Sequence, residues 1–154
     1  MTTFDHEPYT SDNLDALVTM WRASFETSVG VTDPHPIADQ KRYFIEEVLP
    51  THEVRVVSDQ GNVIAFIAAS SDGVAQLYVD VAFQGRGIGT MLLNWAKERS
   101  NGALWLYTFA RNQGARSFYE KHGFRVTATG FEATWQLEDV RYEWTEGKTG
   151  TDRS

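Results

Sequence analysis

The segment DVAFQGRGIGTMLLNWAKER, residues 80–99, joins a strand-like stretch to a helical pattern through three alternating glycines, Gly85, Gly87 and Gly89. Glycine weakens a helix interior by about 0.5–1 kcal/mol relative to alanine, so its repeated use at the start of a helix needs a reason. A glycine turn at a helix N-terminus exposes free N–H groups at the positive end of the helix dipole, which favours anion binding. Arg86 adds a positive charge to this turn, either for a phosphate or as a solvated loop residue.

Two familiar phosphate-binding motifs do not fit this segment. A P-loop needs Lys-Ser/Thr after its last glycine, and no lysine follows the glycines here. A dinucleotide-binding unit needs Gly-x-Gly-x-x-Gly and an acidic residue about 20 positions later. Residues 103–111, ALWLYTFAR, contain no Asp or Glu, so a nucleotide-dependent oxidoreductase is a disfavoured alternative.

The pattern around the glycines predicts one α/β domain over residues 1–145, followed by a flexible polar tail at 146–154. Asp12 is the expected N-cap of the first helix, and Ile37, Phe44, Ile45 and Val48 form the apolar stripe of the second. Helices are predicted at 12–26, 37–49, 88–100 and 112–124, and strands at 53–58, 63–70, 74–82, 103–110, 125–130 and 140–145. The turns DQGN and SDG predict an antiparallel meander over 53–82, and the helix at 88–100 should make strand 103–110 parallel to 74–82, within a mixed sheet.

Composition excludes several function classes. The chain carries 21 acidic and 14 basic residues, a net charge of −7, and has no Lys/Arg-rich run, which argues against a nucleic-acid partner. It has no cysteine, and no spacing of His, Asp or Glu predicts a metal site. No apolar run approaches the ~20 residues of a membrane helix, and the polar N-terminus is unlike a secretory signal. We therefore expect a cytoplasmic protein with no membrane partner.

The glycine segment resembles the pyrophosphate loop Gln-x-x-Gly-x-Gly/Ala of the GCN5-related N-acetyltransferases (GNAT), with Gln84, Gly87 and Gly89 at its defining positions. The segment NQGARSFYEKHGF is similar to that family's Asn-x-x-Ala-x-x-Phe-Tyr-x-x-x-Gly-Phe, and its matching residues are Asn112, Ala115, Phe118, Tyr119, Gly123 and Phe124. The resemblance covers roughly residues 4–145 and implies a GNAT-like fold with a splayed central strand pair and helices on both faces.

The resemblance also implies a cosubstrate, acetyl-CoA, and no metal. Its pantetheine arm would lie between the strands holding Leu77–Val81 and Leu104–Phe109, paired with backbone groups around Val79 and Val81. The amides of residues 84–90 would bind the pyrophosphate, and these residues are Gln84, Gly85, Arg86, Gly87, Ile88, Gly89 and Thr90. The glycines would then be needed because side chains would block that approach.

Two residues of the second motif carry expected roles. Tyr119 matches the family's general acid that protonates the departing CoA thiolate, and its alternative role is that of a core tyrosine beside Phe118. Asn112 would hold the pantetheine arm, cap the following helix, or do both. The general base stays open between Asp80, His35, Glu26 and a bound water, whereas His6, His52 and His122 are expected at the surface.

Aromatic residues are the only sequence signal for the acceptor. Trp105, Tyr107 and Phe109 should point to one side of their strand, and Trp21 and Phe25 lie on the first helix. Core packing explains most of these rings, although some would suit an ammonium or a planar substrate. The end of the chain, EDVRYEW, resembles bacterial members of the family, but FEATWQLE at 131–138 departs from them and leaves the acceptor open.

The expected function is acetyl transfer from acetyl-CoA to a primary amine of a small molecule or peptide by direct attack. The alternative is a catalytically silent acyl-CoA-binding or sensor module of the same fold. The family resemblance also implies a homodimer formed through the C-terminal strands.

Overall fold

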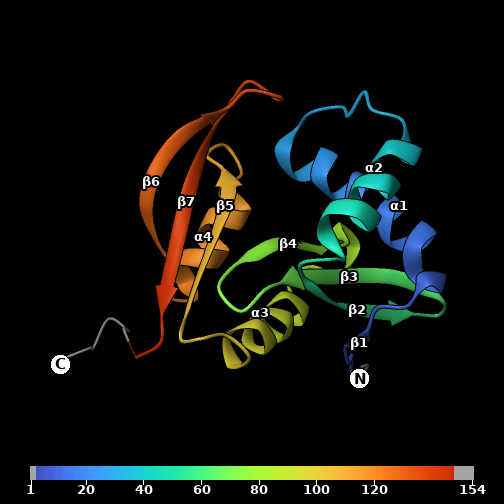
Figure 1. The fold of residues 1–154 in the computed structure, drawn as a ribbon, viewed down its shortest axis with the longest axis horizontal. Helices are drawn as coiled ribbons and strands as arrows, with labels where there is room; N and C mark the ends of the chain where they lie inside the picture. The colour runs from blue at the N-terminus through green and yellow to red at the C-terminus, as the bar shows by residue number, and fades with distance from the viewer. Residues whose placement is uncertain (1–2, 148–154) are drawn as a thin grey trace.

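The computed structural model of the protein describes residues 3–147, so most of the predicted flexible tail lies outside the described residues. Figure 1 shows two β-sheets that diverge from each other, with helices packed against both. The sheets have the strand orders β1-β2-β3-β4 and β5-β7-β6, and all paired neighbours are antiparallel. The strands are β1 (Glu7–Pro8), β2 (Glu53–Asp59), β3 (Asn62–Ala69), β4 (Val74–Val79), β5 (Ala103–Phe109), β6 (Arg125–Glu132) and β7 (Leu137–Thr145).

The helices follow the predicted order with shifted ends. They are α1 (Leu14–Val29), α2 (Ile37–Tyr43), α3 (Ile88–Glu98) and α4 (Gln113–Lys121), together with the short helices η1 (Ser11–Asn13), η2 (Phe44–Val48) and η3 (Val81–Phe83). None of the helices within residues 3–147 is both long and apolar enough to cross a bilayer. The expected α/β fold and the antiparallel meander of β2, β3 and β4 are confirmed.

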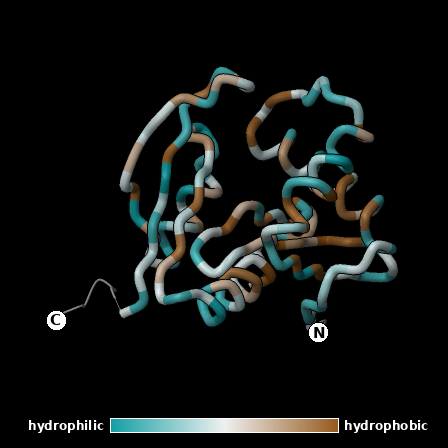
Figure 2. Tube along the Cα trace, viewed as in Figure 1, coloured by the Kyte–Doolittle hydropathy of each residue, from teal (hydrophilic) through white to brown (hydrophobic). Residues whose placement is uncertain are grey.

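Strand β3 is buried along nearly its whole length because helices cover both faces of its sheet. Ala65 and Ile67 pack in a core that includes α3, whereas Phe66 and Ala68 pack in a second core that includes α1. Figure 2 shows β3 as an almost continuous hydrophobic stretch. A strand covered on both faces needs such an uninterrupted apolar run rather than polar–apolar alternation.

Strands β4 and β5, predicted at 74–82 and 103–110 to pair in parallel, do so at one place only. Gly73 and Trp105 form a single parallel bridge, and the Trp105 N–H donates to the Asp72 carbonyl at 3.1 Å. Beyond this bridge β4 and β5 belong to separate sheets. The two strands therefore splay apart, as the family resemblance implied, instead of forming a ladder in one mixed sheet.

Several predicted boundaries differ from the structure; β7, for example, begins at Leu137 rather than at 140, and three other differences have a local cause. Helix α1 begins at Leu14 with Asn13 at its N-cap, not with Asp12, because the preceding residues form the 3₁₀ turn η1. The predicted helix 37–49 changes to a π-helix at Phe44, within which Ile45 is 46% exposed, and Ile37 at the start of α2 is 38% exposed, so neither is buried as predicted. Widening the turn shifts the helical stripe, and Phe44 and Val48 keep the buried positions.

The predicted strand 74–82 ends at Val79. The Asp80 carboxylate accepts a hydrogen bond from the Ala82 N–H at 2.9 Å and caps η3, the turn that leads to the glycine segment. Val81 consequently lies in this turn and is 47% exposed, so it is not a strand residue. A capping carboxylate of this kind satisfies turn amides that a continuing strand would have left unpaired.

Candidate active site

The inner edge of β4 has backbone groups that its own sheet does not use. The Asp80 N–H donates to the Ile64 carbonyl at 2.7 Å, which makes these two residues a hydrogen-bonded pair. Because hydrogen-bonded and non-hydrogen-bonded pairs alternate in antiparallel sheets, the backbone groups of Val79 and Leu77 point away from β3. The Gln84 side-chain amide donates to the Val79 carbonyl at 3.1 Å, so that carbonyl already has one partner.

The facing edge of β5 also has free backbone groups, although the Phe109 carbonyl already accepts the Asn112 N–H. Since the Trp105 N–H points toward Asp72, the same alternation turns the backbone groups of Tyr107 and Phe109 toward β4. The two strands have already diverged at this height. A wedge lined by backbone donors and acceptors on both sides is the result, and an extended chain of the right width would pair with both edges.

A cavity of about 440 Å³ lies along the β4 side of this wedge, against the start of α3 and against α4; we call it the loop cavity. It brings together nearly all of the residues that the sequence predicted for acetyl-CoA and catalysis. Those lining it are Val79, Gln84, Gly85, Gly87, Ile88, Gly89, Thr90, Asn112 and Tyr119.

Two predicted residues do not line the loop cavity. Val81 faces outward in the η3 turn. The Arg86 guanidinium lies over the Phe83 ring, with its central carbon 5.1 Å from the ring centroid. The expected contact of Arg86 with a phosphate stays a prediction that requires this side chain to move or the phosphate to reach past the loop.

The structure gives two different reasons why glycine occupies positions 85, 87 and 89. Gly85 and Gly87 adopt left-handed φ values of +80° and +83°, which side chains disfavour, and Gly87 is the N-cap of α3. A Cβ on Gly89, in contrast, would lie 3.3 Å from Cζ of Phe118 on α4. The turn conformation and helix packing thus explain the glycines before any ligand is considered. The amides of the first turn of α3 have no partners within the helix and are directed at the loop cavity.

Tyr119 lies where both of its predicted roles require it, and its role as the general acid stays a prediction. Its side chain is 7% exposed and packs edge-to-face against Phe124, with Tyr142 nearby, as a core residue does. It also lines the loop cavity. Burial raises the pKa of Tyr119 far above its usual value of 10, and the neighbouring Tyr78 phenol raises it further. The Tyr119 hydroxyl therefore carries its proton throughout the physiological pH range.

Asn112 is held firmly at the junction of β5 and α4. Its side-chain oxygen accepts a hydrogen bond from the Ala115 N–H at 3.1 Å, which confirms its role as a helix cap. Its backbone N–H donates to the Phe109 carbonyl at 3.0 Å. Asn112 lines both the loop cavity and a second, larger cavity, and Tyr78 is the other residue that does so.

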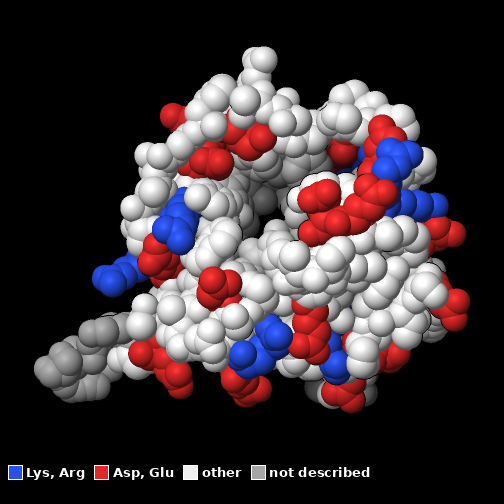
Figure 3. All heavy atoms as spheres, in the orientation of Figure 1, with Lys and Arg blue, Asp and Glu red and all other residues white. Residues whose placement is uncertain are grey.

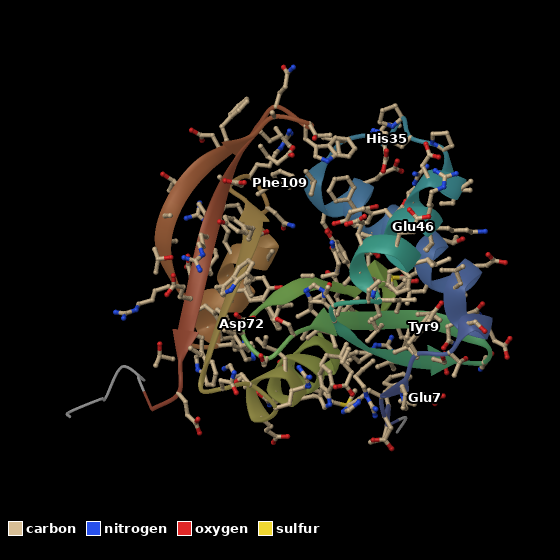
Figure 4. All side chains as sticks on the ribbon, in the orientation of Figure 1. Glu7, Tyr9, His35, Glu46, Asp72 and Phe109 are labelled. Atoms are coloured by element: carbon tan, nitrogen blue, oxygen red, sulfur yellow. The ribbon has the colours of Figure 1, made fainter. Side chains whose placement is uncertain are left out.

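This larger cavity, about 760 Å³, separates the β5-β7-β6 sheet from α1 and α2; we call it the acceptor cavity. Figure 3 shows the molecule hollowed between these two parts. In Figure 4, Phe109 projects from β5 and His35 from the segment between α1 and α2, on opposite sides of the opening. Its aromatic lining consists of Trp21, Phe25, Tyr43, Tyr78, Tyr107, Phe109 and Trp135. Trp105, by contrast, is not among the lining residues; it packs against Tyr107 and beneath Arg141.

The acceptor cavity is acidic. Its described lining includes no Lys or Arg and four carboxylates, from Asp33, Asp39, Glu132 and Asp139. Glu132 accepts a hydrogen bond from the Trp135 N–H at 2.7 Å, and Asp39 pairs with Arg42 outside the cavity at 3.0 Å. The remaining negative potential favours a cationic occupant.

Asp33 and His35 form a hydrogen-bonded pair at the rim of the acceptor cavity. His35 Nδ1 lies 2.7 Å from Asp33 Oδ1, and the His35 ring meets Trp135 edge-on. Burial disfavours the charged form of Asp33, but hydrogen bonds from His35 and the nearby Arg22 guanidinium lower its pKa overall. Asp33 is therefore ionised and orients the imidazole.

Of the three side chains considered as general base, only His35 lines the acceptor cavity. The Asp80 carboxylate caps the η3 turn, and Glu26 accepts a hydrogen bond from the Asp33 N–H at 2.7 Å. Within residues 3–147, no group of three or more His, Asp or Glu side chains is arranged to hold a metal ion.

Sequence reasoning missed several lining residues. Tyr78, shared by both cavities, carried a usable signal, because strand alternation places it on the face opposite Val79. His122 was expected at the surface, yet it lines the loop cavity; its spacing of four residues from Phe118 on a helix would have placed the two together. The segment that departs from the family pattern, 131–138, supplies Glu132, Thr134 and Trp135 to the acceptor cavity.

Comparisons with known proteins agree with this geometry. Residues 50–126 match the family described as Acetyltransferase (GNAT) domain. The chain is 28% identical over 114 residues to the peptidyl-lysine N-acetyltransferase YjaB of Salmonella typhimurium, a match covering 73% of this chain and 77% of that protein. It is 40% identical over 55 residues to the uncharacterized N-acetyltransferase MJ1207 of Methanocaldococcus jannaschii, which is 33% of this chain but only 24% of that protein.

The same fold is found in the crystal structure of PaiA N-acetyltransferase from Thermoplasma acidophilum in complex with coenzyme A. The two structures share a TM-score of 0.74 at 19% identity, over 94% of this chain and 99% of that chain. The family match spans half of the sequence and includes both the glycine loop and the segment from Asn112 to Phe124. With the splayed strands and the loop cavity in the places that these motifs require, the chain belongs to the GNAT family of acetyltransferases.

Proposed function

We propose that the protein transfers the acetyl group of acetyl-CoA to an amine. The observation that carries this proposal is the meeting of two cavities at Tyr78 and Asn112. The loop cavity offers unpaired helix amides and strand edges to the phosphates and the pantetheine arm, and the acceptor cavity offers acidic and aromatic walls to an amine. A thioester at their junction would be accessible from both sides.

The chemistry needs little beyond positioning and proton transfer. The amine nitrogen attacks the thioester carbonyl, the C–N bond forms, and the C–S bond breaks to release CoA thiolate. Tyr119 would donate a proton to that thiolate, and it is always protonated for this task, although its raised pKa makes it a weak acid. The proton of the attacking amine leaves to a base, for which His35 or a water molecule is the candidate.

The acceptor is proposed to be a primary amine on a small molecule or a peptide. The carboxylates and aromatic rings of the acceptor cavity support a cationic amine, since aromatic faces and carboxylates both attract ammonium groups. The relative YjaB is named for acetylation of peptidyl lysine, which is one such amine.

Two measurements test the proposal against the silent-module alternative. Calorimetric titration should show that acetyl-CoA binds, and a screen of amines with detection of released thiol should find amine-dependent turnover. Binding without thiol release on any amine would favour the acyl-CoA-binding module instead. Absence of acetyl-CoA binding would contradict both.

A homodimer is also proposed, on the basis of the family resemblance. Strand β6 is the outer strand of its sheet, pairs only with β7 in the sheet order, and is exposed along almost its whole length. Such an edge can pair with a second copy. Sedimentation velocity at several concentrations would measure the oligomeric state, and a monomer at all concentrations would contradict this proposal.

A further inference from the structure

His122 connects the two helices that border the loop cavity. It follows α4, where its Nδ1 lies 2.8 Å from the Phe118 carbonyl oxygen and its ring packs against the Phe118 ring at a tilt of 42°, with the centroids 4.5 Å apart. Its Nε2 lies 3.0 Å from the Thr90 hydroxyl in the first turn of α3. Both His122 and Thr90 line the loop cavity.

The direction of these hydrogen bonds follows from the chemistry of the groups. A carbonyl oxygen only accepts, so the His122 Nδ1 must carry a proton. In the neutral ring Nε2 then has a lone pair, and the Thr90 hydroxyl must donate its single proton to it. In the protonated ring Nε2 itself donates, and the Thr90 proton becomes available to another acceptor.

The direction of the hydrogen bond between His122 and Thr90 determines whether the Thr90 hydroxyl can donate to an anion at the start of α3. With neutral His122, the hydroxyl turns only its lone pairs toward the cavity, which repels a phosphate oxygen. With protonated His122, the hydroxyl can donate to that oxygen, and the imidazolium adds a positive charge nearby. We infer that His122 is a positioning residue for the CoA pyrophosphate, which acts through Thr90, so that binding of the cosubstrate takes up a proton. The inference rests on the proposed function only in taking CoA as the occupant of the loop cavity.

Two lysines lie close to this position, and the nearest carboxylate along α4, from Glu120, accepts a hydrogen bond from the Tyr142 hydroxyl. Lys121 lines the cavity beside His122, and Lys97 of α3 donates to the His122 carbonyl oxygen at 2.6 Å. Burial lowers the pKa of Lys97. Arg86 lies over Phe83 at the loop, and Tyr119, with its raised pKa, stays neutral. Imidazole is the side-chain group whose charge ordinarily changes near neutral pH.

Titration calorimetry with acetyl-dephospho-CoA tests this inference. This ligand keeps the pyrophosphate but lacks the 3′-phosphate, whose own titration would obscure the result. Repeating the titration in buffers of different ionisation enthalpy should show uptake of up to one proton, and the affinity should rise about tenfold from pH 8 to pH 6. Binding without proton uptake in this range would overturn the inference while leaving the proposed function intact, whereas no binding at all would overturn both.

Two variants test whether His122 acts through the Thr90 hydroxyl or directly, through the charge of its imidazolium. His122→Phe keeps an aromatic ring against Phe118 but cannot titrate, so its affinity should not change with pH. Thr90→Val removes the hydroxyl, and it should abolish most of the proton uptake although His122 is still present. Full proton uptake by Thr90→Val would contradict the action of His122 through the Thr90 hydroxyl. The wild-type measurement decides the main point even if either variant folds poorly, which circular dichroism would reveal.

Discussion

At the scale of single residues, the proton on Tyr119 is held by its apolar surroundings. Its ring fills a place in the core against Phe124 and Tyr142, while the same side chain lines the cavity proposed for the thioester. Burial raises the pKa of Tyr119, so the phenol stays protonated at physiological pH but is a weak acid. Because a thiolate is a good leaving group, the contribution of Tyr119 should lie at the low end for general acids, which is about 10²-fold.

Tyr119→Phe should lower kcat and kcat/KM together by about a hundredfold, with little change in acetyl-CoA affinity. The reason is that the hydroxyl acts on the leaving sulfur in the transition state and not on the bound cosubstrate. The melting temperature should change little, since the ring contacts remain. Steady-state kinetics and thermal unfolding on one preparation make the measurement, and turnover within twofold of wild type would exclude Tyr119 as the acid.

Tyr142→Phe is the matched control. The Tyr142 hydroxyl accepts from Arg116 at 3.0 Å and donates to Glu120 at 2.7 Å, and Tyr142 is not among the residues lining either cavity. Its removal should lower the melting temperature by breaking hydrogen bonds to charged groups, while the folded fraction keeps its kcat. Tyr119→Phe should therefore change turnover with little effect on stability, and Tyr142→Phe should change stability with little effect on turnover.

Tyr78 predicts an alkaline limit to stability. Burial raises its pKa to about 12, while in the unfolded chain it titrates near 10. The unfolded state therefore releases this proton first, and the stability that is fully present below pH 10 is lost as pH rises toward 12. Denaturant unfolding at a series of pH values measures this loss, and Tyr78→Phe should show a smaller decrease between pH 10 and 12 than wild type.

At the scale of elements, the short motifs could be predicted from sequence and the element ends could not. The loop before α3 and the cap of α4 are encoded within a few residues, as the left-handed Gly87 and the capping Asn112 show. The end of β4 depends on which way the Asp80 carboxylate turns, and the π-helix at Phe44 on a local change of backbone hydrogen bonding. Neither of these leaves a periodic signal in the sequence.

Gly87→Glu should lower the affinity for acetyl-CoA by more than tenfold, which corresponds to about 1.4 kcal/mol. The new side chain would place bulk and negative charge among the amides that are proposed to bind the pyrophosphate. Calorimetric titration measures the change, and unchanged affinity would contradict the assignment of this loop.

Gly61→Glu provides the control for backbone strain. Gly61, in the turn between β2 and β3, has the same left-handed φ of +83° as Gly87, and an added Cβ would have no neighbour within 4 Å at either position. Both variants should lose similar stability. Loss of acetyl-CoA affinity in Gly61→Glu as well would show that strain, not the ligand contact, explains the effect.

At the scale of the whole molecule, the acceptor cavity was beyond reach of sequence reasoning because its walls are far apart in the chain. They come from α1, the segment around Asp33, α2, β4, β5 and residues 132–139. The rings of Phe25 and Phe109 were noted as candidates, but only the divergence of the two sheets places them across a shared space from the carboxylates. The approach of these segments to one another is a property of the tertiary structure, and no local sequence pattern indicates it.

The acidic walls predict a preference for acceptors with a second positive charge. Wild-type protein should acetylate a linear diamine with higher kcat/KM than the alkylamine of equal length, and an amino acid should be poorest. Asp139→Asn should reduce this preference, because its carboxylate lies over Gly130 on the cavity side, with Oδ1 3.0 Å from where a Gly130 Cβ would be. Equal kcat/KM values for diamine and alkylamine in the wild type would contradict the prediction.

The single bridge between Gly73 and Trp105 also means that the protein without its cosubstrate carries two unfinished strand edges in its interior. Unpaired edges of this kind exchange their amide hydrogens quickly and invite pairing with other chains. An occupant of the wedge would act as the missing strand, so acetyl-CoA should slow hydrogen exchange at Val79 and Tyr107 and raise the melting temperature as its concentration rises. Aggregation during purification should accordingly decrease when CoA is added, and the proposed cosubstrate would then stabilise the fold as well as take part in the reaction.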